Sequence, residues 1–279
     1  MNKKELSQKM RVCGWICAVG ILFLQSLTIG YAGCEEAFSS SKSVPPNTLT
    51  PEEKAAGWEL LFDGKTTRGW RRAGGKGFPS YGWRVENGCL RHVDGSGGGD
   101  IVTERTFRDF ELRFEWKIGP HANSGVKYFV DEKRGAHLGH EYQLLGEEPQ
   151  TEDRTGNVRN RRRKRVDRLH VTGAFYDVWP VSDNRPIRPP GQWNQSCILV
   201  CGNHVEHWLN GVKILEYELG SPEVLAAVAR SKFRDVPRFG QKVTGHILLQ
   251  DHGGDVWFRN IKIRVLKPEE IRRCNQRKP

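Results

Sequence analysis

The sequence lacks the cysteine and histidine spacings that are typical of zinc sites, although seven of its 279 residues are cysteine. Cys13 and Cys17 fall in an apolar N-terminal stretch. Cys197 and Cys201 lie four positions apart in a predicted strand, too far along it to bridge each other. We therefore expect no disulfide scaffold, and we expect Cys89, Cys197 and Cys201 to be small buried hydrophobic residues.

Aromatic residues are missing from the most basic segment of the chain, residues 151–168. Much of the formal net charge of +11 lies in this segment and in a second basic cluster at residues 272–278. Nucleic-acid-binding proteins interleave aromatic residues with such runs or place the runs on a helix. We therefore expect solvated loop and tail at these two places and no nucleic-acid partner. Binding to an anionic surface or a polyanionic glycan stays open as an alternative, which the salt dependence of heparin binding would test.

No internal repeat is present, and the composition favours strands over helices. The 31 Gly and 14 Pro imply many turns, and a hydrophobic content of 37%, with nine Trp and twelve Phe, is enough for a sizeable core. All-β domains often exceed 200 residues as a single unit. We therefore expect one domain at residues 57–266, an N-terminal appendage before it, and a basic tail at residues 267–279.

The first 33 residues have the features of an export signal. Basic residues precede an uncharged stretch at residues 12–33, whose most apolar part, residues 16–24, matches the core of a signal peptide. The small residues before Cys34 resemble the cleavage site of a bacterial lipoprotein, although Tyr31 stands where that pattern prefers an aliphatic residue. Lipidation of Cys34, ordinary cleavage near Ala32 and an uncleaved anchor stay open. In each case we expect an exported protein that is periplasmic or membrane-anchored.

Alternation of apolar and charged residues predicts the strands. The clearest strand covers residues 110–118, where five apolar residues alternate with four charged ones, so one face must belong to a core. A turn at residues 121–125 is expected to lead into another strand at 126–130. Two tight turns within residues 197–217 predict a meander of three strands. Residues 245–261 are expected to form one β-hairpin, whose turn carries His252.

A few short helices complete the prediction. Residues 34–56 are expected to form a flexible tether followed by a short helix that Thr50 caps, and a second helix is expected to follow Ser221. Many alternating strands with few helices indicate an antiparallel β-sandwich. If one of its sheets curves, Glu141, Gln143 and Arg259 would lie on the outward, concave face.

Nine short motifs resemble one known family over residues 57 to 265. They occupy residues 57–64, 122–126, 141–143, 173–176, 191–194, 209–211, 231–233, 249–253 and 258–261, and the first reads GWELLFDG. The chain resembles the 3-keto-disaccharide hydrolase family. The resemblance implies a concanavalin A-like jelly-roll fold, export from a bacterial cell, sometimes with a lipid anchor, and action on sugars oxidised at C3. The basic insert at residues 151–169 departs from the family pattern and borders the strand that carries Glu141.

The chemistry implied by this resemblance assigns roles to two residues. A ketone at C3 makes the C2 proton acidic, so elimination of the glycosidic oxygen followed by addition of water gives net hydrolysis. Such a site needs a base, an acid, and donors or a cation for the enolate. His252 is the first candidate for base or acid, because imidazole titrates near neutral pH, and Glu141 is the second. Without the resemblance, a turn histidine and an exposed strand carboxylate are the simpler interpretations.

Seven residues are candidates for binding the sugar. Amide and hydroxyl groups could bond sugar hydroxyls, aromatic rings could stack on the sugar, and Arg259 could stabilise the enolate. Each also has a structural interpretation: an Asn-Ser-Gly turn, a buried aromatic ring, or a solvent-exposed row of charges. The candidates are Asn123, Ser124, Gln143, Tyr176, Trp193, Gln250 and Arg259.

The sequence leaves alternatives open for cofactor use and for the reaction class. Glu141, Gln143 and His252 could hold a divalent metal that polarises the ketone, although no ligand spacing requires one. A non-catalytic glycan-binding module is the alternative to an enzyme that cleaves 3-keto-glycosides. A conventional glucanase is disfavoured, because the sequence lacks the Glu-x-Asp-x-x-Glu strand motif that places two carboxylates on one face.

Overall fold

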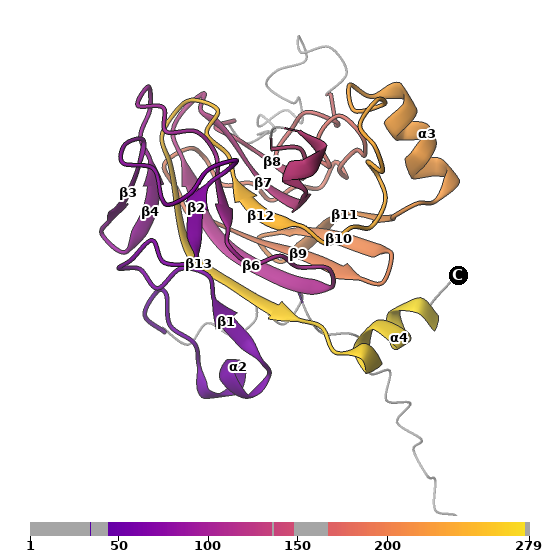
Figure 1. The fold of residues 1–279 in the computed structure, drawn as a ribbon, viewed down its shortest axis with the longest axis horizontal. Helices are drawn as coiled ribbons and strands as arrows, with labels where there is room; N and C mark the ends of the chain where they lie inside the picture. The colour runs from indigo at the N-terminus through magenta and orange to yellow at the C-terminus, as the bar shows by residue number, and fades with distance from the viewer. Residues whose placement is uncertain (1–33, 35–43, 136, 148–166, 277–279) are drawn as a thin grey trace, which may run out of the picture. The chain divides into compact units, whose positions relative to one another are not determined.

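The computed structural model describes residues 34, 44–135, 137–147 and 167–276. Within these residues, two antiparallel β-sheets pack against each other around a shared core (Figure 1). The predicted signal at residues 1–33 and most of the basic insert lie outside the described residues. No helix in the described part is long and apolar enough to cross a membrane.

The larger sheet has eight strands in the order β11-β10-β9-β6-β13-β4-β3, and β1 also pairs with β13. Strands β9 to β11 form the predicted meander, which is confirmed. The strands are β1 (Trp58–Leu60), β3 (Trp83–Glu86), β4 (Cys89–His92), β6 (Phe110–Ile118), β9 (Asn194–Cys201), β10 (His204–Leu209), β11 (Val212–Glu218) and β13 (Val256–Val265).

The smaller sheet has five strands in the order β2-β5-β12-β7-β8. Its outward face carries the candidate site described below. The strands are β2 (Trp70–Arg72), β5 (Ile101–Thr103), β7 (Asn123–Val130), β8 (His140–Leu145) and β12 (His246–Leu249).

The core lies between the two sheets and follows the predicted alternation. All five apolar side chains of β6 are buried, and on the facing sheet Tyr142 and Leu144 are fully buried while Glu141 and Gln143 point the other way. The predicted β-sandwich is therefore confirmed, and its two stacked antiparallel sheets have the jelly-roll architecture.

The predicted hairpin at residues 245–261 is wrong. Strand β12 pairs with β5 and β7, whereas β13 pairs with β1, β4 and β6, so the chain crosses from one sheet to the other between them (Figure 1). Gly253 and Gly254 have φ of 90° and 88°, a backbone region that favours glycine, and they reverse the chain there. An alternating pattern predicts that a segment is a strand but not which strand it pairs with.

The expected free state of the cysteines is also wrong, except at Cys89, which is buried and free. Cys34 is disulfide-bonded to Cys197, and Cys201 is disulfide-bonded to Cys274. The spacing of the cysteines excluded only a bridge between Cys197 and Cys201 on β9. The true partners of these two cysteines are 163 and 73 residues away. A sulfur in a disulfide carries no thioether lipid, so lipidation of Cys34 requires that this disulfide be absent, and it stays a prediction.

The helices confirm the capping signals and correct the tail. Helix α2 (Pro51–Ala55) begins with the predicted capping box, and α3 (Pro222–Arg230) begins after Ser221. A 3-10 helix, η1 (Glu132–Arg134), follows β7. Residues after β13 form α4 (Pro268–Gln276), a helix without buried residues, so the predicted solvated tail is helical. The second disulfide ties this helix to β9.

Candidate functional site

The outward face of β7 and β8 brings together polar side chains from three segments. In the strand register Lys127 lies opposite Glu141, and Gly125 lies opposite Gln143. A Cβ atom at Gly125 would lie 2.5 Å from the Glu141 carboxylate, so only glycine at this position leaves space for the carboxylate. Gln250, which follows β12, extends the same face.

Glu141 is a buried carboxyl group beside a single lysine. Its Oε2 lies 3.8 Å from Lys127 Nζ, and the two side chains are only 8% and 12% exposed. With its amide oriented to suit both neighbours, Gln250 donates to Glu141 Oε1 at 3.2 Å and accepts from Lys127 Nζ at 3.1 Å. Burial raises the pKa of Glu141 above its ordinary value, while Lys127 and Lys232 act in the opposite direction. The group is therefore a stronger base than an exposed glutamate.

His252 is exposed and is held by a chain of two amides. Asn123 Nδ2 lies 2.8 Å from His252 Nδ1, and Gln143 Nε2 donates to Asn123 Oδ1 at 3.1 Å. This contact orients the ring and leaves Nε2 directed away from Asn123. Gln143 is buried and its Oε1 has no hydrogen-bond partner, which marks a place where a ligand donor would be favourable.

A buried aspartate anchors the loop that carries His252. Asp100 Oδ1 accepts a hydrogen bond from the backbone N–H of Asp251 at 2.8 Å. Asp251 in turn accepts from Gly99 N at 2.9 Å and lies 2.8 Å from His92 Nε2. Burial raises the pKa of Asp100 despite the nearby Lys127. These three contacts of Asp251 hold the loop that carries His252.

Tyr176 lies beside the site, as predicted. Its backbone N–H donates to the carbonyl of Glu141 at 3.1 Å, and Lys232 Nζ lies 4.3 Å from the centre of its ring. Lys127, Asp100 and Lys232 also lie at this site, although they are not among the residues predicted from the sequence. Lys127 had a detectable signal, since it lies four residues from Asn123 and therefore on the same face of a strand.

Ser124 is not placed to bind a sugar. It is fully buried, and its Oγ donates to the backbone carbonyl of Gln250 at 2.8 Å. The predicted turn at residues 121–125 is partly strand, because β7 begins at Asn123, so Ser124 alternates to the opposite face from Asn123.

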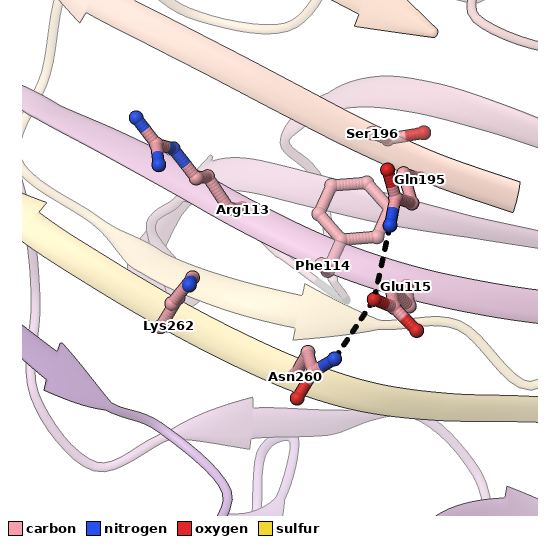
Figure 2. A pocket seen from close by; sticks show the side chains of 7 residues that line it. All are labelled: Arg113, Phe114, Glu115, Gln195, Ser196, Asn260 and Lys262. Atoms are coloured by element: carbon pink, nitrogen blue, oxygen red, sulfur yellow. Dashed lines mark hydrogen bonds between the residues drawn. The ribbon is translucent and has the colours of Figure 1, made fainter. Parts of the chain in front are cut away.

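Arg259 and Trp193 are not part of this site. Both lie on the outward face of the eight-stranded sheet, where the Arg259 guanidinium is 4.0 Å from the Trp193 ring centre and donates to Glu115 at 2.7 Å. Glu115 also accepts from Gln195 and Asn260 (Figure 2). The cavity there measures about 70 Å³, far below the roughly 300–1,000 Å³ of ligand pockets. The predicted place of Arg259 was wrong because it assumed that β12 and β13 pair, whereas Trp193 lies here because it directly precedes β9 of the same sheet.

In the described part of the chain, the His, Cys, Asp and Glu atoms that lie close enough to share an ion form two groups, and neither contains Glu141 or His252. In one group the two sulfurs form the Cys34–Cys197 disulfide, and in the other Lys213 forms ion pairs with both carboxylates. A divalent metal held by Glu141, Gln143 and His252 stays a prediction.

Comparisons with known proteins agree with this architecture. Residues 57–264 match the family described as a 3-keto-alpha-glucoside-1,2-lyase-like domain. A 3-keto-disaccharide hydrolase from Bacteroides thetaiotaomicron is 33% identical over 265 residues, which cover 83% of this chain and 87% of that protein.

Two crystal structures from Parabacteroides distasonis, both of proteins described as glycosyl hydrolases, are also similar. One is 35% identical, with a TM-score of 0.67, and the match covers 80% of this chain and all of the other. The second is 25% identical, with a TM-score of 0.56, over 75% of this chain and 99% of the other. The chain therefore belongs to the 3-keto-alpha-glucoside-1,2-lyase-like family of enzymes, as its nine ordered motifs predicted.

Proposed function

We propose that this protein cleaves 3-keto-glycosides by eliminating the glycosidic oxygen and then adding water. The observation that carries the proposal is a single outward face of the five-stranded sheet that combines a buried carboxyl group, a lysine 3.8 Å away and an exposed histidine oriented by amides. The names of the related proteins support the substrate class.

In the elimination step, Glu141 removes the proton from C2 of the 3-keto sugar. The electron pair of the broken C–H bond forms an enolate on the C3 oxygen. The Lys127 ammonium, whose Nζ lies 3.8 Å from the Glu141 carboxylate, stabilises this enolate. The enolate then collapses, the bond from C1 to the glycosidic oxygen breaks, and His252 gives a proton to the departing oxygen. An exposed imidazole suits this role because it recovers its proton from water.

In the second step, water adds to C1 of the unsaturated sugar, and Glu141 returns its proton to C2. The sum of both steps consumes one water molecule and gives a 3-keto monosaccharide and a free alcohol. The buried amide of Gln143, whose Oε1 has no partner, is placed to accept a hydrogen bond from a sugar hydroxyl.

Purified full-length protein incubated with a 3-keto-disaccharide would test this function. We expect cleavage by the wild type and loss of at least about 100-fold in kcat/KM in Glu141→Gln and His252→Ala, with folding unchanged by circular dichroism. Full activity in both variants would reject these roles. Binding of unoxidised oligosaccharides without turnover of any keto-sugar would instead indicate a glycan-binding module. A parallel incubation with chelator tests whether a divalent metal takes part.

We also infer that the protein is exported. Disulfides persist in oxidising compartments, and two are present in the described residues. Cell fractionation combined with mass measurement of the mature N-terminus tests this inference, and a reduced, uncleaved chain in the cytoplasm would reject it.

A further inference from the structure

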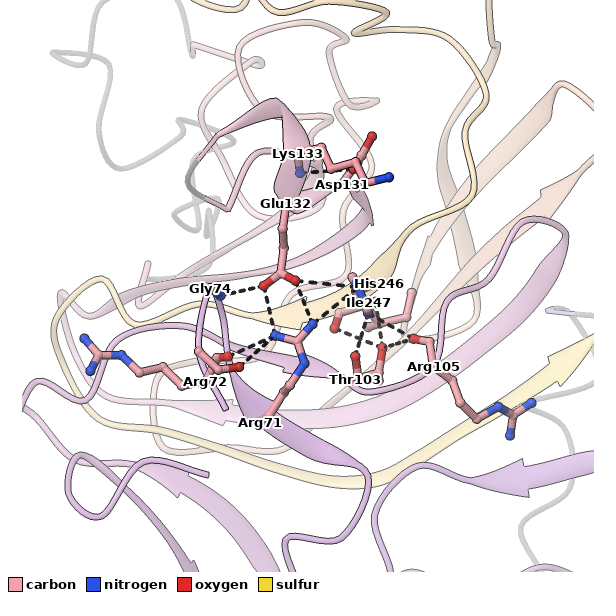
Figure 3. Close-up of polar contacts among 11 residues, drawn as sticks. Arg71, Arg72, Gly74, Thr103, Arg105, Asp131, Glu132, Lys133, His246 and Ile247 are labelled. Atoms are coloured by element: carbon pink, nitrogen blue, oxygen red, sulfur yellow. Dashed lines mark hydrogen bonds and ion pairs between the residues drawn. The ribbon is translucent and has the colours of Figure 1, made fainter. Parts of the chain in front are cut away.

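A segment between β7 and β8 folds over the outward face of the five-stranded sheet and is clasped to β2. Glu132 accepts hydrogen bonds from both terminal nitrogens of Arg71, at 2.9 and 2.6 Å, and from the backbone N–H of Gly74 (Figure 3). The hydrogen-bonded Arg71 guanidinium lowers the pKa of Glu132 to about 2. His246 lies 3.8 Å from the same carboxylate. The clasp fixes the start of this segment against the sheet.

The same segment brings His137 to Asp100. His137 Nδ1 lies 3.7 Å from Asp100 Oδ2, is itself buried, and has no hydrogen-bond partner. The His137 side chain is 34% exposed, so the side of the ring that carries Nε2 is open to water. His137 also has φ of 64°, a region that few non-glycine residues adopt and that costs about 1 kcal/mol or more. At 3.7 Å the Asp100 carboxylate makes no hydrogen bond to the ring, but it stabilises the ring once the ring has taken up a proton.

Asp100 is placed to stabilise a protonated His137. Its side chain is 13% exposed, Oδ1 is engaged by Asp251 N, and Oδ2 faces His137. Lys127, which faces Glu141, and Asp251 also act on Asp100. Asp100 therefore joins the segment that carries His137 to the loop that carries His252.

We propose that His137, which lies beside Asp100, is the general base that activates water in the hydration step. This inference rests on the proposed function. Glu141 is only 6% exposed and holds the C2 proton at that stage, so the base is His137 or the deprotonated His252. Of these two, His137 lies beside a carboxylate, which stabilises the ring once it is protonated. The water oxygen bonds to C1 while one of its protons moves to His137 Nε2. The electron pair of the C1–C2 double bond shifts toward the ketone, and C2 takes its proton back from Glu141. The proton gained by His137 and the one lost by His252 then exchange with solvent.

The test follows both products of a 3-keto-disaccharide with full-length protein. His137→Gly accepts the unusual backbone angle and leaves space for imidazole. We expect elimination within about threefold of wild type, hydration slowed at least about 100-fold, build-up of the ultraviolet-absorbing unsaturated sugar, and recovery of hydration with added imidazole. Asp100→Asn should slow hydration in the same direction. His121→Gly is the matched control, because His121 is exposed, has φ of 58°, and should behave as wild type.

Hydration at the wild-type rate in His137→Gly would overturn the inference. Equal loss of elimination and hydration, without recovery in imidazole, would also overturn it, because that result indicates a structural role. A wild-type protein that forms neither product would reject the proposed function and this inference together, whereas the first two outcomes leave the proposed function intact.

Discussion

The outward faces of the two sheets carry similar residue types in different states. On the eight-stranded sheet, Glu115 accepts hydrogen bonds from Arg259, Gln195 and Asn260. On the five-stranded sheet, Glu141 has only Lys127 and Gln250 beside it, although it is more deeply buried. A carboxylate with three donors is a structural element. A buried carboxylate with few donors keeps a proton more readily and can exchange it with a substrate.

The same contrast applies to the aromatic and cationic groups. Lys117 lies 4.3 Å from the ring centre of Trp257 and 5.4 Å from that of Trp193, so these rings already have cationic partners. On the other face, Gln143 has an acceptor without a partner and His252 is exposed. Whether a face can bind a ligand therefore depends more on its unsatisfied polar groups than on its residue types.

The largest expected effect distinguishes Lys127 from Lys117. Lys127→Met should lower kcat/KM for a 3-keto-disaccharide by about 10² to 10³, because it removes the cation beside the developing enolate. Lys117→Met, on the opposite face, should stay within about twofold. Steady-state kinetics with both variants measures the difference. Equal losses in the two variants would remove the functional distinction between the faces.

The second effect concerns stability on the eight-stranded sheet. Replacing Cys201 and Cys274 by serine should lower the free energy of unfolding by about 2–4 kcal/mol, because the disulfide no longer restricts the unfolded chain. Activity at 25 °C should be retained, since β9 is remote from the site sheet. Urea denaturation and kinetics on the same preparation measure both. An unchanged denaturation midpoint would show that this disulfide contributes nothing to stability.

The third effect tests the structural role of Arg259. Arg259→Gln should reduce the free energy of unfolding by about 1 kcal/mol, because Glu115 loses one of its donors while keeping two. Its kcat/KM should match the wild type. A loss of more than tenfold in kcat/KM would return Arg259 to the catalytic machinery.

The smallest effect is a gain in stability. Because burial raises the folded-state pKa of Glu141, its ionised form is disfavoured in the folded protein. That penalty is absent at low pH, where both states are protonated; it grows as pH rises above the unfolded-state pKa and is complete above the folded-state pKa. Glu141→Gln should therefore match the wild type near pH 4 and be more stable at pH 8.

The matched control for this gain is Glu115→Gln, which should lose stability at pH 8 because Arg259 loses its partner. Denaturant unfolding at the two pH values measures both variants. Destabilisation of Glu141→Gln at pH 8 would mean that Lys127 outweighs the burial of the carboxylate.

Much of the fold could be predicted because alternation in sequence reports burial directly. Strand β6, the meander and the two capped helices appeared where the pattern placed them. The pairing of β12 and β13 could not, since the same alternation suits a hairpin and a crossing between sheets. That single difference moved Arg259 to the far side of the sandwich from His252.

By itself, the sequence determined the strands, their inward faces, the helix caps and the family, because each depends on neighbouring residues or on ordered motifs. Only the tertiary structure decided the disulfide partners, the sheet to which each strand belongs, and the meeting of Asp100, His137 and Lys127 with Glu141. Those features depend on contacts between residues far apart in the chain, which local spacing does not encode.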